Sequence, residues 1–234
     1  ASGLCTVQLL IGFWIFLIYG KWRRKLLNKK IFIFGILIIT LLHLFGGLTD
    51  SIKRNYELPV SIWQTNIPTR EKLKIDDKFI EEKLSIAQKY ALANKAKLLV
   101  APEGTLPNNF YLAKSSKVNI LVGGFRNYHN ELRSSLLGFQ IGDQTFSTYI
   151  DKNRLVPLGE RIPRFLNNFS KGLSAVGGIQ PGSNSRFFDS KFAPPFAVAI
   201  CYEISDGLKI RKAIKSGAKL IITSANLDPY PTKL

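Results

Sequence analysis

A single cysteine in the C-terminal part of the chain stands where a nucleophile would be expected. Cys201 follows the apolar run from Phe196 to Ile200 and precedes a polar stretch that begins at Tyr202. When a strand ends in a sharp turn into a helix, its last side chain points into a cleft, and backbone amides at the helix start can face an oxyanion. This setting predicts a reactive thiol, and a buried cysteine of the core is the alternative.

Two other strand ends carry side chains that could activate this thiol. An apolar strand runs from Leu98 into Glu103, and Lys152 precedes an apolar turn. A carboxylate can accept the proton of a thiol, while a nearby ammonium lowers the pKa of the thiol and stabilises negative charge. We predict Cys201 as the nucleophile, Glu103 as the general base and later general acid, and Lys152 as the oxyanion-binding group together with the backbone N–H of Tyr202.

The segments around these three residues resemble the nitrilase superfamily and, within it, the apolipoprotein N-acyltransferases. The matching motifs are Pro102-Glu103-Gly104, Leu155-Val156-Pro157-Leu158-Gly159-Glu160 after Lys152, and Cys201-Tyr202-Glu203. The resemblance extends from about Pro59 to the C-terminus. It implies a Glu-Lys-Cys triad and an α/β fold, a nitrilase-like αββα sandwich. We expect Glu160 and Glu203 to position Lys152 or the incoming amine, with structural ion pairs as the alternative.

The resemblance implies an acyltransferase with a two-step reaction. A fatty acyl chain would move from a phospholipid to Cys201 as a thioester, and the N-terminal cysteine amine of an apolipoprotein would then accept it. No metal and no organic cofactor is implied. Two alternatives stay open: a membrane-tethered nitrilase-type amidase that hydrolyses a small amide, and a catalytically silent membrane scaffold that retains the fold.

Two apolar segments near the N-terminus predict transmembrane helices. Residues 1–20 contain no charge, and 31–49 form a second uncharged run, each long enough to cross a bilayer core. The segment 21–30 between them is strongly basic, so we expect this loop in the cytoplasm and the body of residues 50–234 on the periplasmic side of a bacterial inner membrane. We therefore expect two domains, a membrane domain over 1–49 and a catalytic domain over 50–234.

The net charge of +17 falls to +11 for the body when the six basic residues of the loop are set aside. This excess suits either anionic lipid headgroups or an evenly solvated surface, and no nucleic-acid-binding motif accompanies it. The chain has two histidines and two cysteines, too few for a zinc cluster, and a Ser-His-Asp site would also need more. Because Cys5 falls in the first apolar segment, we expect no internal disulfide.

Apolar periodicity in the body predicts alternating strands and helices. We expect strands at Val60 to Gln64, Lys97 to Ala101, Asn119 to Phe125, Ser134 to Ile141, Phe146 to Ile150, Phe196 to Ile200 and Lys219 to Ser224, and helices at Asp77 to Asn94 and about Asp206 to Ser216. The glycine-rich stretch from Asn167 to Ser185 is either a surface loop or a lid that admits an acyl chain. The chain contains no methionine and ends soon after Ser224, and we expect a fragment, truncated at its C-terminus and inactive alone.

Overall fold

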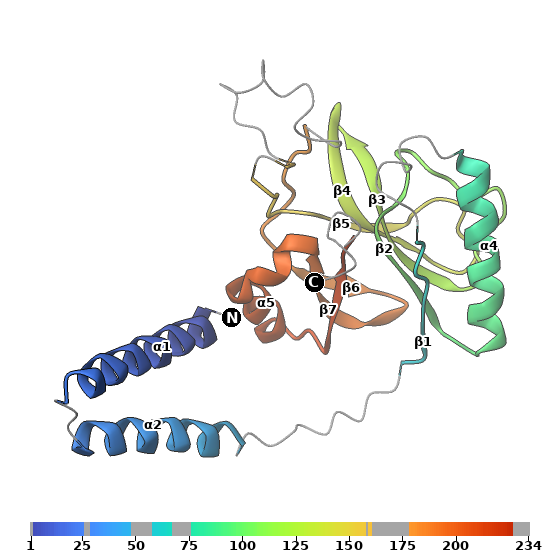
Figure 1. Ribbon diagram of the computed structural model, residues 1–234. Helices are drawn as coiled ribbons and strands as arrows, with labels where there is room; N and C mark the ends of the chain where they lie inside the picture. The colour runs from blue at the N-terminus through green and yellow to red at the C-terminus, as the bar shows by residue number, and fades with distance from the viewer. Residues whose placement is uncertain are drawn as a thin grey trace. The chain divides into compact units, whose positions relative to one another are not determined.

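The computed structural model describes residues 2–25, 29–47, 58–66, 76–157, 159–160 and 178–226. The chain divides into two compact units, Ala1–Glu57 and Leu58–Leu234. Figure 1 shows helices in the first unit and strands covered by helices in the second.

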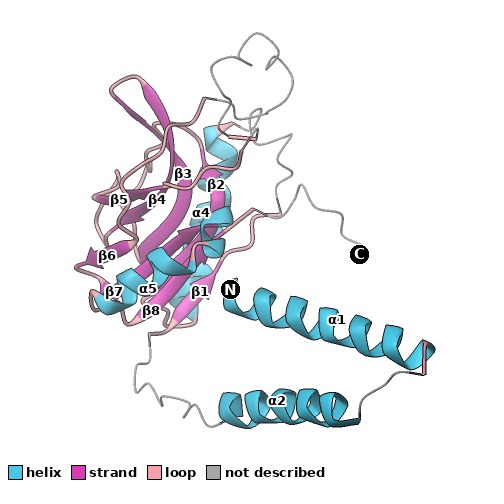
Figure 2. Cartoon of the chain, turned by 90° about the vertical axis from the view of Figure 1, so that its left-hand side faces the viewer, coloured by secondary structure: helices cyan, strands magenta, loops and turns pink. Residues whose placement is uncertain are grey.

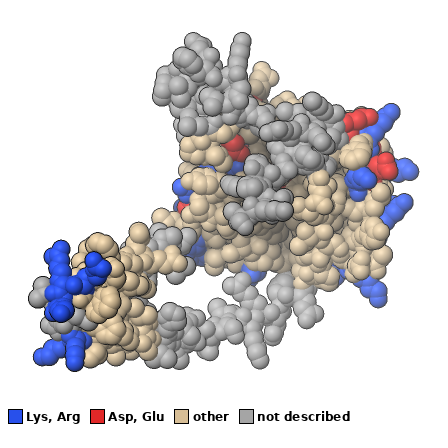
Figure 3. Space-filling view, viewed as in Figure 1, with Lys and Arg blue, Asp and Glu red and all other residues tan. Residues whose placement is uncertain are grey.

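The first unit contains two helices, α1 (Ser2–Arg23) and α2 (Lys29–Gly47), at the positions of the two predicted apolar segments. The ring of Trp14 in α1 stacks on Phe32 in α2, with ring centroids 6.1 Å apart. Basic side chains gather where α1 ends and α2 begins, as Figure 3 shows. Among the helices within the described ranges, none is both long and apolar enough to cross a membrane. The prediction of two spans is not confirmed.

The second unit contains a five-stranded sheet of order β1-β2-β3-β4-β5. Its strands are β1 (Val60–Ile62), β2 (Leu98–Leu106), β3 (Asn119–Tyr128), β4 (Glu131–Phe139) and β5 (Thr148–Asp151). The first three run parallel, and β4 and β5 are antiparallel to their neighbours. The helix α4 (Asp77–Ala93) joins β1 to β2, and its N-cap Asp76 accepts a hydrogen bond from the backbone of Lys78.

A second sheet of order β6-β7-β8 follows. Its strands are β6 (Phe187–Ser190), β7 (Ala193–Ile200) and β8 (Leu220–Ser224), and the 3-10 helix η2 (Cys201–Ser205) and helix α5 (Gly207–Lys215) connect β7 to β8. The strand β7 is antiparallel to β6 and parallel to β8.

Alternation along the strands assigns the buried side chains to three layers, because successive residues of a strand point to opposite faces. On β2, Leu99 faces α4, whereas Leu98 faces the second sheet. On β7, Phe196 and Val198 face the first sheet, whereas Ala197 packs against α5. The order α4, sheet, sheet, α5 is the predicted αββα sandwich (Figure 2).

Two of the differences between the observed and the predicted elements concern strands β2 and β6. The strand β2 continues past Glu103 to Leu106, with a change of register between Ala101 and Leu106. The short strand β6 was not predicted, because four residues are too few to show a clear alternation. Most of the predicted lid, and the end of the chain from residue 227, lie outside the described residues.

Candidate active site

Cys201 lies at the turn between β7 and η2, with a backbone φ of +52°. A residue with a side chain pays about 1–2 kcal/mol for this left-handed conformation, and such strain concentrates at functional sites. The thiol is half-buried and is not in a disulfide. The predicted sharp turn at the cysteine is thus present in the fold.

Lys152 follows directly on β5, and its side chain is fully buried between two carboxylates. Its Nζ donates to Oε1 of Glu103 at 2.8 Å and to Oε1 of Glu160 at 2.6 Å. Glu160 also accepts from the backbone N–H of Val156 at 2.8 Å, which ties the turn after Lys152 to the same carboxylate. The strand β3 passes so close to Glu103 that a Cβ at Gly123 would collide with the Glu103 backbone.

The charges around the site favour a protonated lysine and a protonated thiol. Burial opposes the charge of Lys152, but the carboxylates of Glu103 and Glu160 outweigh burial, and the pKa of Lys152 is raised. Burial also raises the pKa of Cys201 to about 11, and Glu103 adds to this effect, whereas Lys152 lowers the pKa. The Lys152 ammonium lowers the thiol pKa as expected, but burial and the Glu103 carboxylate raise it by more, so the net shift is upward. The resting thiol is neutral at pH 7 and needs a base at the moment of attack.

Glu203 is buried, and its partners differ from those of Glu160, whose carboxylate accepts a hydrogen bond from the Lys152 ammonium. It accepts from the backbone N–H groups of Asn153 at 2.7 Å and of Ile200 at 2.9 Å, and it pairs with Arg186 at 2.8 Å. Its contacts therefore link the residue after Lys152 to the residue before Cys201. The neighbouring Tyr202 is partly exposed, and the guanidinium of Arg154 lies 4.8 Å from its ring centroid.

Sequence reasoning missed a set of buried polar residues behind Lys152. Arg126 forms two hydrogen bonds to the carboxylate of Asp151, at 2.7 and 2.6 Å, and Ser135 donates to the same carboxylate at 2.7 Å. Arg186 donates to the backbone carbonyl of Asp151 at 2.8 Å. The one sign of this set in the sequence was Asp151 beside Lys152. Without its partners on other strands, Asp151 cannot be told from an ordinary surface carboxylate.

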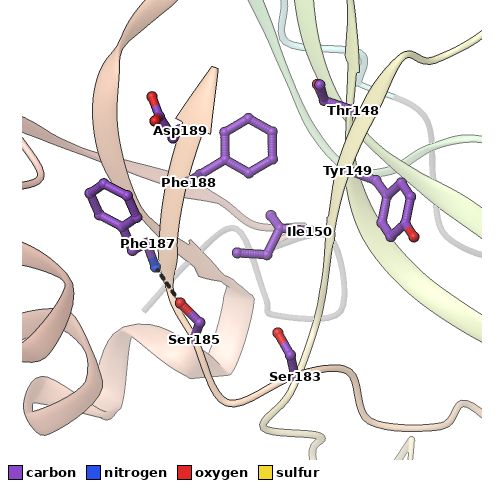
Figure 4. Close-up of a pocket in the computed structure, with 8 residues that line it drawn as sticks. All are labelled: Thr148, Tyr149, Ile150, Ser183, Ser185, Phe187, Phe188 and Asp189. Atoms are coloured by element: carbon purple, nitrogen blue, oxygen red, sulfur yellow. Dashed lines mark hydrogen bonds between the residues drawn. The ribbon is translucent and has the colours of Figure 1, made fainter. Parts of the chain in front are cut away.

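A cavity of about 340 Å³ lies where the edge strands β5 and β6 of the two sheets approach each other (Figure 4). Its lining residues are Thr148, Tyr149, Ile150, Ser183, Ser185, Phe187, Phe188 and Asp189. None of the predicted site residues lines it. In the part of the chain that the structure describes, no cluster of His, Cys, Asp and Glu could hold a metal ion.

Comparisons with known proteins show which sequences and solved structures this chain is similar to. No family model matches the chain. An apolipoprotein N-acyltransferase from Prochlorococcus marinus subsp. pastoris is 67% identical over 234 residues, which are 100% of this chain and 47% of that protein. A second, from Prochlorococcus marinus strain MIT 9313, is 42% identical over 236 residues, covering 100% of this chain and 47% of that protein. The chain spans about half the length of the curated relatives it matches.

Solved structures with a similar fold include a nitrilase-superfamily protein from Saccharomyces cerevisiae, with a TM-score of 0.46, 16% identity, and coverage of 68% of this chain and 63% of that chain. A carbon-nitrogen hydrolase from Helicobacter pylori has a TM-score of 0.49 and 14% identity, and covers 71% of this chain and 59% of that chain.

The αββα sandwich that brings a glutamate, a lysine and a cysteine together is the arrangement that the sequence resemblance to the nitrilase superfamily implied. The sequence matches are more specific than this class, because the whole chain aligns with about half the length of curated relatives that are named apolipoprotein N-acyltransferase.

Proposed function

We propose that this chain carries the catalytic centre of an enzyme that transfers a fatty acyl group from a phospholipid to the N-terminal cysteine amine of an apolipoprotein. The convergence of Glu103, Lys152 and Cys201 supports this proposal most directly. The side chains of Glu103 and Lys152 are hydrogen-bonded, and both influence the pKa of the Cys201 thiol. The names of the relatives supply the acceptor class.

In the first half-reaction, Glu103 takes the proton of the Cys201 thiol as the sulfur attacks the ester carbonyl of the phospholipid. The resulting oxyanion is stabilised by the Lys152 ammonium and by the backbone N–H of Tyr202. The tetrahedral intermediate collapses to a thioester, and the proton passes from Glu103 to the leaving lysophospholipid alkoxide. A neutral resting thiol fits this concerted use of the base, because the proton leaves only when the acyl donor is in place.

In the second half-reaction, the acceptor amine attacks the thioester carbonyl. Glu103 accepts a proton from the amine and returns it to the departing Cys201 sulfur, which leaves an amide on the acceptor and restores the thiol. Glu160 is proposed to hold Lys152 in place throughout, since its carboxylate lies 2.6 Å from the Lys152 Nζ. The residues that carry these steps require no cofactor.

We also propose a bacterial inner-membrane location, with 1–49 as two spans and the catalytic body on the periplasmic side. The support is the uncharged character of the two apolar segments and the basic residues between them. Labelling of intact cells with an impermeant thiol reagent should modify an introduced Asn130→Cys but not an introduced Asn28→Cys. The opposite labelling pattern would contradict the proposed orientation.

The activity is tested with the full-length protein and a phospholipid that carries a labelled fatty acyl chain. Mass spectrometry should find one fatty acyl group on the peptide containing Cys201, and the adduct should disappear when a lipopeptide with a free N-terminal cysteine amine is added. Cys201→Ala is the matched control, because it keeps the fold and removes the sulfur. An enzyme that hydrolyses small amides and forms no acyl adduct would support the amidase alternative instead.

A further inference from the structure

Arg186 is a buried side chain near the site with hydrogen bonds from all three of its nitrogen atoms. Its side chain is 1% exposed, and it lies just before β6, in the segment that passes between the two sheets. Figure 4 shows the neighbouring Ser183 and Ser185 in this segment. Sequence analysis assigned no role to Arg186.

The guanidinium group has five N–H donors, and the structure gives a partner to each. Nη1 donates to both carboxylate oxygens of Glu203 at 2.8 Å. Nη2 donates to the carbonyl of Asp151 at 2.8 Å and to the carbonyl of Ser183 at 2.7 Å. Nε donates to the carbonyl of Ser185 at 2.8 Å. No donor is left over for a ligand, so the group acts within the protein.

These partners lie on both sides of the site. Asp151 directly precedes Lys152, and Glu203 in turn accepts from the N–H of Asn153, which directly follows Lys152. The backbone is thus held on both sides of the lysine by one ion pair. The other oxygen of Glu203 accepts from the N–H of Ile200, the residue before the cysteine. A single buried pair therefore connects the end of β5 with the turn that presents the thiol.

We infer that Arg186 is a positioning residue that sets the place of Lys152 relative to Cys201. This role rests on the proposed function for the meaning of those two residues. A planar guanidinium can bind a carboxylate and two carbonyls at once in a fixed geometry, whereas a lysine ammonium is a point charge on a flexible chain. Lysine at position 186 would keep the charge opposite Glu203 and lose the connection to the Asp151 carbonyl.

The test measures the thiol directly in the full-length protein, without any acyl donor. Iodoacetamide is added between pH 7 and pH 10, and alkylation of the Cys201 peptide is followed by mass spectrometry. Because Lys152 lowers the thiol pKa and Glu103 and Glu160 raise it, a displaced lysine makes the thiol a weaker acid. If the thiol became a tenfold weaker acid, the fraction of thiolate at pH 9 would fall about tenfold. The more basic thiolate is also more nucleophilic, so alkylation would slow by only about threefold. We expect at least this slowing for Arg186→Lys.

The control is Arg133→Lys, which changes an arginine that contacts the same segment through the Pro181 carbonyl at 3.1 Å, pairs with Glu131 and lies 3.5 Å from the Asp151 carboxylate, an ion pair that lysine can keep. Its alkylation profile should match the wild type.

Arg186→Lys with wild-type alkylation at every pH would overturn the inference, and a loss of thermal stability without a change in the profile would assign Arg186 a purely structural role. If Arg186→Lys does not fold, the double variant Arg186→Met/Glu203→Met, which leaves no unpaired buried charge, gives the same readout. Acyl transfer does not enter this measurement, so a different reaction at Cys201 would not affect its outcome.

Discussion

Replacing Glu103 by glutamine should make Cys201 react faster with a simple alkylating reagent while stopping acyl transfer. Burial is the largest cause of the raised thiol pKa, followed by the charge of Glu103, which also hydrogen-bonds to the thiol, whereas Lys152 acts in the opposite direction. Glutamine has nearly the same shape as glutamate and no charge. The variant therefore loses one cause of the raised thiol pKa, while the Lys152 ammonium still lowers that pKa. It also loses the group proposed to accept the thiol proton.

The size of the effect follows from the thiolate fraction. With a pKa of about 11, roughly one thiol in a thousand is ionised at pH 8. If Glu103→Gln makes the thiol a tenfold stronger acid, the thiolate fraction rises about tenfold, and the lower nucleophilicity of the less basic thiolate reduces the gain in alkylation rate to about threefold. Below the pKa, the rate should climb with pH in both proteins, and the variant curve should lie at lower pH.

The assay compares alkylation of Cys201 by iodoacetamide at pH 8 with formation of the fatty acyl adduct in the same preparations. Glu160→Gln is the matched control, because it also removes a carboxylate from Lys152 but contributes less to the thiol pKa and accepts no hydrogen bond from the thiol. Its alkylation rate should rise by less than that of Glu103→Gln. Slower alkylation of Glu103→Gln than of the wild type would refute the electrostatic reasoning, and retained acyl transfer would refute the assignment of the base.

Three further outcomes are expected of the full-length protein. Lys152→Met should slow acylation by about a hundred- to a thousandfold, the usual effect of losing one oxyanion-stabilising contact, and a change below about threefold on that scale would exclude the proposed role. Cys201→Gly should be more stable to heat than Cys201→Ala by about 1 kcal/mol, because glycine accepts the left-handed backbone without strain, and equal unfolding temperatures would argue against strain at the turn. Arg126→Met should lower the free energy of unfolding by about 3–5 kcal/mol, since it leaves the buried Asp151 carboxylate without its main partner, and a loss below about 1 kcal/mol on that scale would mean that the pair is dispensable.

The sequence allowed prediction of most of the fold because most strands alternate or are continuously apolar. The helix from Asp77 was predicted to within one residue, and the strand that leads into Cys201 was predicted with the correct end and a start three residues too late. The end of β2 was placed too early, since Pro102, Glu103 and Gly104 resemble a loop when their neighbours on β3 are unknown.

The candidate site was predictable only in part. Charged and nucleophilic residues at strand ends are visible in a sequence. The motif after Lys152 also included Glu160, whose carboxylate accepts a hydrogen bond from the Lys152 ammonium. The partners of Glu203 and Asp151 could not be found in this way. Arg126 lies on β3 and reaches Asp151 across the strands of the same sheet, whereas Arg186 comes from the segment before β6, so both partners are distant in the sequence and only the folded chain brings them to these carboxylates.

The layer of apolar side chains between the sheets also has a kinetic consequence. Glu103 lies in the five-stranded sheet and Lys152 directly follows its strand β5, whereas Cys201 follows a strand of the three-stranded sheet. Side chains such as Leu121, Phe196 and Ile200 fill the space between the two sheets. The thickness of this layer therefore sets the distance between Glu103, the proposed base, and Cys201, the proposed nucleophile. We therefore expect substitutions in this layer to change the reactivity of the Cys201 thiol although they replace none of the three residues of the candidate site.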